Sequence, residues 1–234
     1  MPLDSANQSV IFKTFVYQRI LKVQKVDTKT KILNAAEQLF AERGYADTSL
    51  RLITSQAEVN LASVNYHFGS KKELIQAVLA RYLEVCAPSL EQSLAVLNKS
   101  DVPFTQHDVF NCLLAPLLEL NTFRHRGTSI FLQLLGRGYI ENQGHLRWFI
   151  TTHYGKVLTA FNKAVQDANP DLSKEEIFWR LHFTLGTVVF TMASSKALID
   201  IAKADFDVDV DIEGLIKRVV PFISSGVSAG GTLP

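Results

Sequence analysis

The segment that most constrains the fold of this chain is Thr48–Leu74, with the sequence TSLRLITSQAEVNLASVNYHFGSKKEL. Apolar residues recur at helical spacing over Ser49–Ala57, and the hydroxyl of Thr48 is predicted to cap that helix. A tight turn follows, and a second helix is predicted over Leu61–Phe68, ended by Gly69 because glycine tolerates a positive φ. Two short helices joined in this way form a helix-turn-helix, which places its second helix in the DNA major groove.

The second predicted helix buries Leu61, Val64 and Phe68 and leaves small and polar side chains on its other face. Ser63 and Asn65 are predicted to face base edges, because hydroxyl and amide groups match the donors and acceptors displayed there. The remaining predicted DNA contacts position the backbone or allow close approach to the groove, and they are Thr48, Arg51, Leu61, Ala62, Tyr66, His67 and Lys71.

The string YHFGSKKEL and the upstream segment ILNAAEQLFAERGYADTSLRLI resemble the TetR family of bacterial transcriptional repressors. The resemblance is specific over residues 29–80, although the family usually has Gly where this chain has Glu58. It implies an all-α fold with an N-terminal three-helix helix-turn-helix DNA-binding domain and a C-terminal helical ligand-binding and dimerisation domain. We expect these domains over residues 27–74 and 75–226, between an extension at 1–26 that is disordered or mobile and a disordered tail at 227–234.

The distribution of charge agrees with a DNA-binding N-terminal part. The whole chain carries a net charge of only +1, but residues 1–85 hold 11 Lys and Arg against 8 Asp and Glu. The remainder holds 13 against 15, so the basic bias falls on the part with the helix-turn-helix. Because the bias is modest, we expect affinity to depend on placed contacts and dimerisation more than on bulk charge.

The rest of the chain is predicted to be helical. A first helix over Asp27–Arg43 precedes the motif, and a connecting helix over Ser70–Val85 follows it and stops near Pro88. The later helices are predicted over Ser89–Asn98, Thr105–Asn121 with a kink at Pro116, Ser129–Tyr139, Gly144–Ala168, a long helix from the Ser173/Glu176 capping box to Ala204, and Ile212–Ser225.

Two apolar stripes near the C-terminus predict a homodimer. One consists of Ile177, Leu181, Leu185, Val188 and Met192, and the other of Leu215, Val219 and Phe222. Two such helices from each subunit would form a four-helix interface, and we favour this over an internal core because a lone motif would bind DNA weakly. A dimer presents two recognition helices and predicts a pseudo-palindromic DNA operator.

Further strings resemble the PsrA-like branch of the TetR family, among them SIFLQLLG, NQGHLRWF and EIFWRLHFTLG. The branch represses fatty-acid degradation genes and releases DNA on binding long-chain fatty acids or their CoA thioesters. The resemblance therefore implies a hydrophobic inducer that shifts the helix Ser70–Val85; a drug or an aromatic compound would fit the same composition. The candidate ligand contacts are Phe131, Leu134, Leu135, Arg137, Arg147, Phe149, Phe178, Phe183 and Phe190, with Arg180 and Lys196 as further cations for the head group.

Enzymatic chemistry and cofactors are not expected. The chain has no nucleophile elbow, no Walker loop and no zinc-type Cys/His spacing, and the Asp205–Asp211 run lacks the Gly and Glu of a calcium loop. Cys86 and Cys112 lie in apolar helical contexts and are predicted to be reduced packing residues.

Cations interrupt the apolar segment Val10–Val26 too often for a membrane span, so we expect a cytoplasmic protein with no membrane partner. A ligand-binding protein without DNA function is the alternative from another class.

Overall fold

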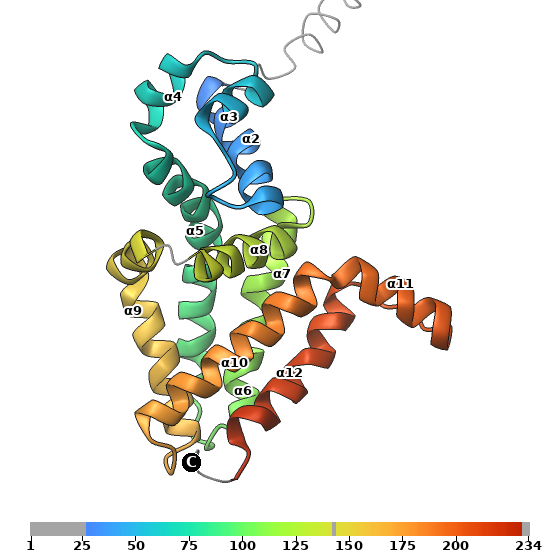
Figure 1. Cartoon of the computed structure of the whole chain (residues 1–234). Coiled ribbons are helices and arrows are strands. Elements are labelled where there is room, and N and C mark those ends of the chain that lie inside the picture. Colours follow the sequence, from blue (N-terminus) through green and yellow to red (C-terminus); the bar gives the residue numbers. More distant parts are fainter. Residues whose placement is uncertain (1–26, 142–143, 231–234) are drawn as a thin grey trace, which may run out of the picture.

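The computed structural model describes residues 27–141 and 144–230 of the chain (Figure 1). Within these residues all regular structure is helical, which confirms the predicted fold class. The N-terminal helices are α2 (Thr28–Arg43), α3 (Leu50–Ala57) and α4 (Leu61–Phe68). The following helices are α5 (Lys71–Leu97), α6 (Gln106–Asn111), α7 (Leu114–Phe123), α8 (Gly127–Ile140), α9 (Gly144–Ala168), α10 (Lys174–Ala193), α11 (Ser195–Phe206) and α12 (Ile212–Ser228).

Helices α2, α3 and α4 pack together at one end of the molecule, and α5 runs from them into a larger helical body (Figure 1). Ile32, Phe40, Ile53 and Val64 are buried between the three N-terminal helices. Their spacing along each helix agrees with the apolar stripe that a helix turns toward a core. The extension at residues 1–26 lies outside the described residues.

Helix α5 is longer than predicted, because Pro88 does not end it. The helix runs unbroken through that residue to Leu97, although proline removes one backbone hydrogen bond from a helix interior. Pro88 itself is exposed, whereas Tyr82, Leu83 and Leu94 on either side of it are buried. Burial of those side chains stabilises the helix on both sides of the proline and offsets the lost bond.

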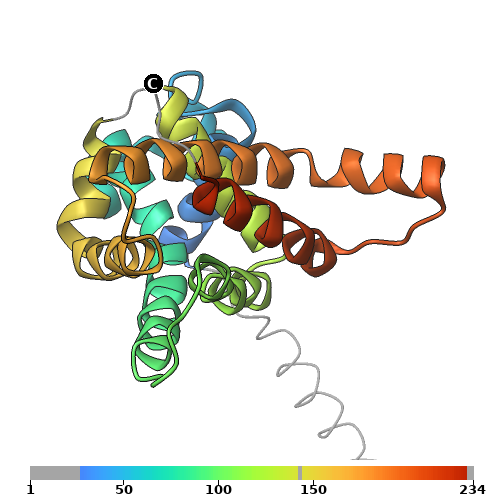
Figure 2. The same ribbon diagram turned by 90° about the horizontal axis from the view of Figure 1, so that it is seen from below.

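Two predicted long helices are each divided in two. The first divides at Cys112 and Leu113, which places Pro116 in the first turn of α7, where the missing N–H has no intrahelical partner to lose. The second divides at Ser194, and α11 leaves the direction of α10 at 70°. Figure 2 shows α11 projecting from the body, with α12 returning beside α10.

Helix α12 extends further than the predicted tail boundary allows. It runs to Ser228, and Val227 is buried, so residues 227 and 228 belong to the helical body. The guanidinium of Arg180 donates to the carbonyl oxygens of Val227 and Ala229, both at 2.6 Å, and so caps the end of α12. Arg180 is therefore a structural residue, not a free cation for a ligand head group.

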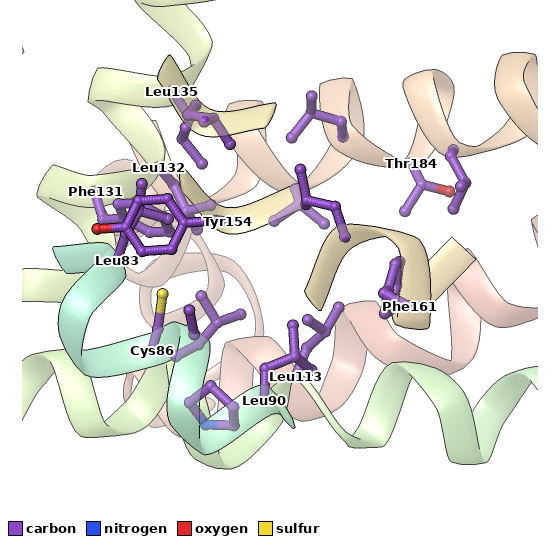
Figure 3. A pocket seen from close by; sticks show the side chains of 18 of the residues that line it. Leu83, Cys86, Leu90, Leu113, Phe131, Leu132, Leu135, Tyr154, Phe161 and Thr184 are labelled. Atoms are coloured by element: carbon purple, nitrogen blue, oxygen red, sulfur yellow. The ribbon is translucent and has the colours of Figure 1, made fainter. Parts of the chain in front are cut away.

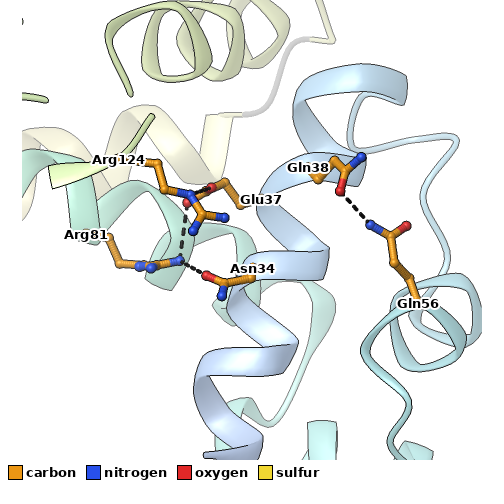
Figure 4. A network of polar contacts seen from close by, with 6 residues as sticks. All are labelled: Asn34, Glu37, Gln38, Gln56, Arg81 and Arg124. Atoms are coloured by element: carbon orange, nitrogen blue, oxygen red, sulfur yellow. Dashed lines mark hydrogen bonds and ion pairs between the residues drawn. The ribbon is translucent and has the colours of Figure 1, made fainter. Parts of the chain in front are cut away.

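A buried carboxylate joins α2 to the larger body (Figure 4). The side chain of Glu37 is 1% exposed and accepts hydrogen bonds from Arg81 Nη1 at 3.2 Å and from Arg124 Nε at 2.6 Å. Arg81 also donates to Asn34. The N-terminal helices are thus fixed to α5 and to the junction between α7 and α8 by ionic contacts.

No single described helix is long and apolar enough to cross a membrane. The bent pair α10 and α11 passes the same test of length and composition only when the two helices are counted together.

Candidate nucleic-acid interface and ligand cavity

The first helix of the helix-turn-helix is capped one residue later than predicted. Ser49, not Thr48, is the N-cap of α3, and its Oγ accepts the N–H of Leu52 at 3.1 Å. Thr48 is fully buried, and its Oγ1 donates to the carbonyl oxygens of Leu39 at 3.2 Å and Gly44 at 2.6 Å. The prediction that its side chain contacts DNA is wrong, because that hydroxyl is enclosed and fixes the turn after α2.

The turn between α3 and α4 accounts for the glycine that the resembled family has at this position. Glu58 has a φ of 53° in the left-handed region, where a side chain is strained and glycine is not. Asn60 then caps α4 by accepting from the N–H of Ser63 at 2.8 Å and from its hydroxyl at 2.9 Å. Because the Ser63 hydroxyl donates its proton to Asn60, it keeps only acceptor capacity for a base edge. The residue itself is half-buried.

The outer face of α4 presents the predicted reading residues. Ala62 and Asn65 are exposed, and the Tyr66 side chain is 85% exposed with its ring 5.1 Å from that of half-buried His67. Leu61 is 41% exposed, so the prediction that it is buried is wrong. It lies in the first turn of α4, and only Val64 and Phe68 of this helix are buried.

The cations beside α4 differ in whether their charged groups are exposed or are held by other residues. Arg51 is exposed on α3. Lys71 Nζ lies 3.5 Å from the carbonyl oxygen of Ala46 and 4.3 Å from the centre of the Tyr45 ring, and burial lowers the pKa of its ammonium group. Lys71 is therefore held against the turn that precedes α3, whereas its neighbour Lys72 is exposed and available to a phosphate.

The larger body encloses an apolar cavity of about 580 Å3, within the usual range of roughly 300–1,000 Å3 for ligand pockets (Figure 3). Its walls come from α5 to α10 and from α12. The side chains of Cys86 from α5, Phe131 from α8, Tyr154 and Phe161 from α9, and Leu113 from the α6–α7 junction project toward the cavity.

Four of the predicted ligand contacts line this cavity, namely Phe131, Leu134, Leu135 and Arg147. Five do not, namely Arg137, Phe149, Phe178, Phe183 and Phe190. Arg137 donates instead to the backbone carbonyl oxygens of Ala41 and Glu42 at the end of α2. Phe149 is half-buried with its ring 4.6 Å from that of His153.

The three remaining aromatic residues lie on the outer face of α10, where Phe178 is 46%, Phe183 60% and Phe190 65% exposed. The apolar stripe predicted for the dimer interface faces the other way: Leu181, Leu185, Val188 and Met192 line the cavity. The internal-core alternative therefore holds for this stripe, and the aromatic residues predicted as ligand contacts point outward instead. Both faces of this helix are apolar, and periodicity alone does not tell which one is turned inward.

The α12 stripe divides in the same way, since Val219 lines the large cavity and Phe222 is 69% exposed. Leu215 lines a smaller cavity of about 260 Å3 between α11 and α12. The exposed aromatic side chains of α10 and α12 leave an uncovered apolar surface on the molecule, of the kind that marks protein interfaces.

Charged groups are scarce in the large cavity. Arg147 is the one Lys, Arg, Asp or Glu among its described lining residues, and it is exposed, so it lies where the cavity meets solvent. Burial raises the pKa of the Cys86 thiol to about 12, so the thiol stays protonated and unreactive at neutral pH. The interior therefore suits an apolar molecule, and its rim offers a cation.

No three His, Cys, Asp or Glu side chains gather as a metal site within residues 27–141 and 144–230.

A helix-turn-helix with an exposed second helix, continued by one long helix into a cavity-bearing helical body, defines the class of helix-turn-helix regulatory proteins.

Comparison with known proteins identifies the family. Residues 32–78 match the family model of bacterial regulatory proteins of the tetR family, and residues 111–226 match that of the tetracyclin repressor-like C-terminal domain. Together these ranges cover more than half of the chain, which belongs to the TetR family.

The curated relatives match this chain over only part of its length and of their own. The transcriptional regulator YttP of Bacillus subtilis is 37% identical over 67 residues, which are 29% of this chain and 32% of YttP. The nicotine-responsive transcriptional repressor HdnoR of Paenarthrobacter nicotinovorans is 31% identical over 103 residues, 43% of this chain and 52% of HdnoR. The chain thus spans between a third and about half of the length of these relatives.

Solved structures share the fold of this chain over more than four fifths of its length. HlyIIR, a hemolysin II transcriptional regulator, superimposes with a TM-score of 0.53 at 20% identity over 84% of this chain and 97% of its own. A TetR-family regulator from Bordetella parapertussis reaches 0.57 at 19% identity over 83% and 93%.

Proposed function

We propose that this protein is a homodimeric, ligand-released repressor of fatty-acid metabolism genes that acts in the cytoplasm. The cavity carries the proposal, because two of its walls, α5 and α8, also hold the DNA-binding helices. An acyl ligand in the cavity would displace these walls and change the spacing of the two recognition helices. DNA and ligand would then weaken each other's binding by the same factor.

The outer faces of α10 and α12 support the dimer. Phe183, Phe190 and Phe222 are each at least 60% exposed, and burying them against a second copy would remove a large apolar area from water. A two-fold axis through this surface would pair two copies of α4, which must lie about 34 Å apart to read successive major grooves. The operator would then be pseudo-palindromic.

For DNA contacts we propose Arg51, Leu61, Ala62, Ser63, Asn65, Tyr66, His67 and Lys71, and we add Lys72. Asn65 is the proposed base-reading residue, because its amide is exposed on α4 and can form two hydrogen bonds to adenine. Asn65→Ala should cost about 1–3 kcal/mol on the operator and little on random DNA. Lys72→Ala should weaken both DNAs alike and lower the slope of log affinity against log salt by about 1. Equal losses on both DNAs for Asn65→Ala would remove it from the base-reading set.

The ligand proposal rests on the cavity's composition together with the PsrA-like resemblance. A lining that is almost wholly apolar suits an acyl chain, and Arg147 at the rim can bind a carboxylate or a CoA phosphate. We therefore propose a long-chain fatty acid or its CoA thioester as the inducer.

A different hydrophobic inducer is the second candidate, favoured by the likeness to the nicotine-responsive HdnoR. The two candidates differ in their need for the cation at the rim, because a neutral or cationic aromatic compound gains nothing from Arg147.

The test compares release of operator DNA by oleate in the wild-type protein, Arg147→Met and Lys163→Met. Lys163 is the matched control, since it is an exposed α9 cation paired with Asp167 and does not line the cavity. Arg147→Met should raise the oleate concentration needed for half-release about tenfold, as expected for losing one charged hydrogen bond, while Lys163→Met should not. Equal sensitivity of all three proteins would refute the role of Arg147.

A further inference from the structure

Helix α8 faces two functional regions at once. Phe131, Leu135 and Gly138 on one side of it line the cavity. Arg137 and Glu141 on another side reach the end of α2 and the turn that follows it. The same helix therefore contacts a bound ligand and the polypeptide immediately before the helix-turn-helix.

Arg137 and Glu141 both bind backbone atoms in this region. Arg137 donates to carbonyl oxygens, and Glu141 accepts from N–H groups. Arg137 Nε donates to the carbonyl oxygen of Ala41 at 2.8 Å, and its Nη2 donates to that of Glu42 at 2.7 Å. These carbonyls lie in the last turn of α2, where intrahelical donors are absent and a cation is favoured. Arg137 thereby caps α2 from outside the DNA-binding domain.

Glu141 binds the other side of the turn. Its two carboxylate oxygens accept the backbone N–H groups of Tyr45 at 3.1 Å and of Ala46 at 2.9 Å. Gly44 makes this approach possible, because a Cβ on it would lie 2.1 Å from Glu141 Oε1 and its φ is 88°. The turn 44–48 is thus held by α8 just ahead of Ser49, the cap of α3.

The other end of α8 is anchored. Arg124, three residues before α8 begins, binds the buried Glu37, and a Cβ on Gly127 would lie 2.0 Å from the Leu120 carbonyl oxygen. Gly136, one residue before Arg137, packs against Val189 of α10 with no room for a side chain, so a shift of α10 would move this end of α8 with it. Displacement of α8 by a ligand is therefore expected at its C-terminal end, which carries Arg137 and Glu141.

We propose that Arg137 and Glu141 are positioning residues that transmit occupancy of the cavity to the recognition unit through the turn 44–48. This inference rests on the proposed function and adds a route through α8 to the expected shift of α5. An occupied cavity pushes the end of α8 outward, Glu141 withdraws from the Tyr45 and Ala46 amides, and the orientation of α3 and α4 relaxes.

The first test uses amide hydrogen exchange of Tyr45 and Ala46 in the full chain without DNA. Cys86→Trp occupies part of the cavity in place of a ligand, since Cys86 projects into it (Figure 3). We expect Glu141→Ala to speed exchange of these two amides about tenfold or more, as the loss of a charged hydrogen bond should. Cys86→Trp should speed it in the wild-type background and add nothing to Glu141→Ala.

The matched control is Glu91→Ala, which removes an exposed carboxylate paired with Lys156 between α5 and α9. It should leave exchange of the turn unchanged. Unchanged exchange in Glu141→Ala itself would overturn the proposal, and so would an equal effect of Cys86→Trp with and without Glu141. Because no DNA or inducer is present, these results stand even if the proposed repressor function fails.

The second test measures binding to DNA from upstream of the protein's own gene. Cys86→Trp should weaken binding about tenfold in the wild-type and Glu91→Ala backgrounds, and less than twofold in Glu141→Ala. A full tenfold effect in the absence of Glu141 would show that the signal bypasses α8. Thermal unfolding of each variant identifies any that fails to fold. If Cys86→Trp is that variant, the smaller Cys86→Phe replaces it in both tests; if Glu141→Ala is, Glu141→Gln replaces it.

Discussion

Removing the carboxylate of Glu37 should separate the DNA-binding helices from the rest of the molecule more than any other single polar change. Its side chain is 1% exposed and binds two arginines from α5 and the α7–α8 junction. Breaking a fully buried ion pair costs about 3–5 kcal/mol, because the remaining charge loses its partner without regaining water.

The arginine side chains keep some access to solvent, which reduces that cost. Arg81 is 20% and Arg124 33% exposed, so each guanidinium can recover part of its hydration when Glu37 is absent. We therefore expect Glu37→Ala to lower the free energy of unfolding by about 2–3 kcal/mol, below the fully buried range. For a chain of this size that corresponds to a fall in Tm of roughly 5–10 °C.

Urea unfolding followed by circular dichroism measures this change, with Glu91→Ala as the control carboxylate on the surface. Glu37→Gln should lose less, since the amide oxygen can still accept one hydrogen bond in the same volume. A loss below about 0.5 kcal/mol for Glu37→Ala would refute the reasoning that this cluster fixes α2 to the body.

Three further changes have defined outcomes. Burial and the neighbouring Glu37 carboxylate raise the pKa of the Tyr82 hydroxyl, but this hydroxyl makes no hydrogen bond of normal length and angle within the described residues. Tyr82→Phe should therefore change the free energy of unfolding by less than about 1 kcal/mol in urea titrations. Burial, with a smaller contribution from Lys72, lowers the pKa of His145 below its ordinary 6.5, so the unfolded chain binds a proton first. Stability should fall as the pH drops below 6.5, and less steeply in His145→Asn. Phe183→Asp should convert the proposed dimer to monomer in sedimentation, whereas an unchanged dimer would move the interface elsewhere.

The helix-turn-helix could be predicted almost residue by residue because its signals are local. Gly69 ends α4 with a φ of 75°, as its tolerance of positive φ predicts. The error at Thr48 arose because two hydroxyl residues stand together, and only the fold shows that Thr48 is enclosed while Ser49 caps the helix.

The cavity could be predicted less well, because its residues are set by how helices face one another. Phe131 and Leu135, two of the predicted ligand contacts, line the cavity, but on α10 both faces are apolar and the sequence does not tell which one is buried. Cys86 and Tyr154 were missed as lining residues, since nothing in their local sequence distinguishes a cavity wall from a filled core. The contacts of Glu141 with the turn 45–46 span 95 residues or more, beyond any local pattern.

The central claim is that filling the apolar cavity releases DNA. The most direct test measures binding of the full chain to DNA upstream of its own gene and of neighbouring lipid-metabolism genes, with and without oleate and oleoyl-CoA. We expect tight, salt-dependent binding that one of the two lipids weakens at least tenfold, with random DNA as the control. Tight binding that neither lipid changes would contradict the acyl inducer, and the absence of salt-dependent binding to any of these DNAs would contradict the repressor itself.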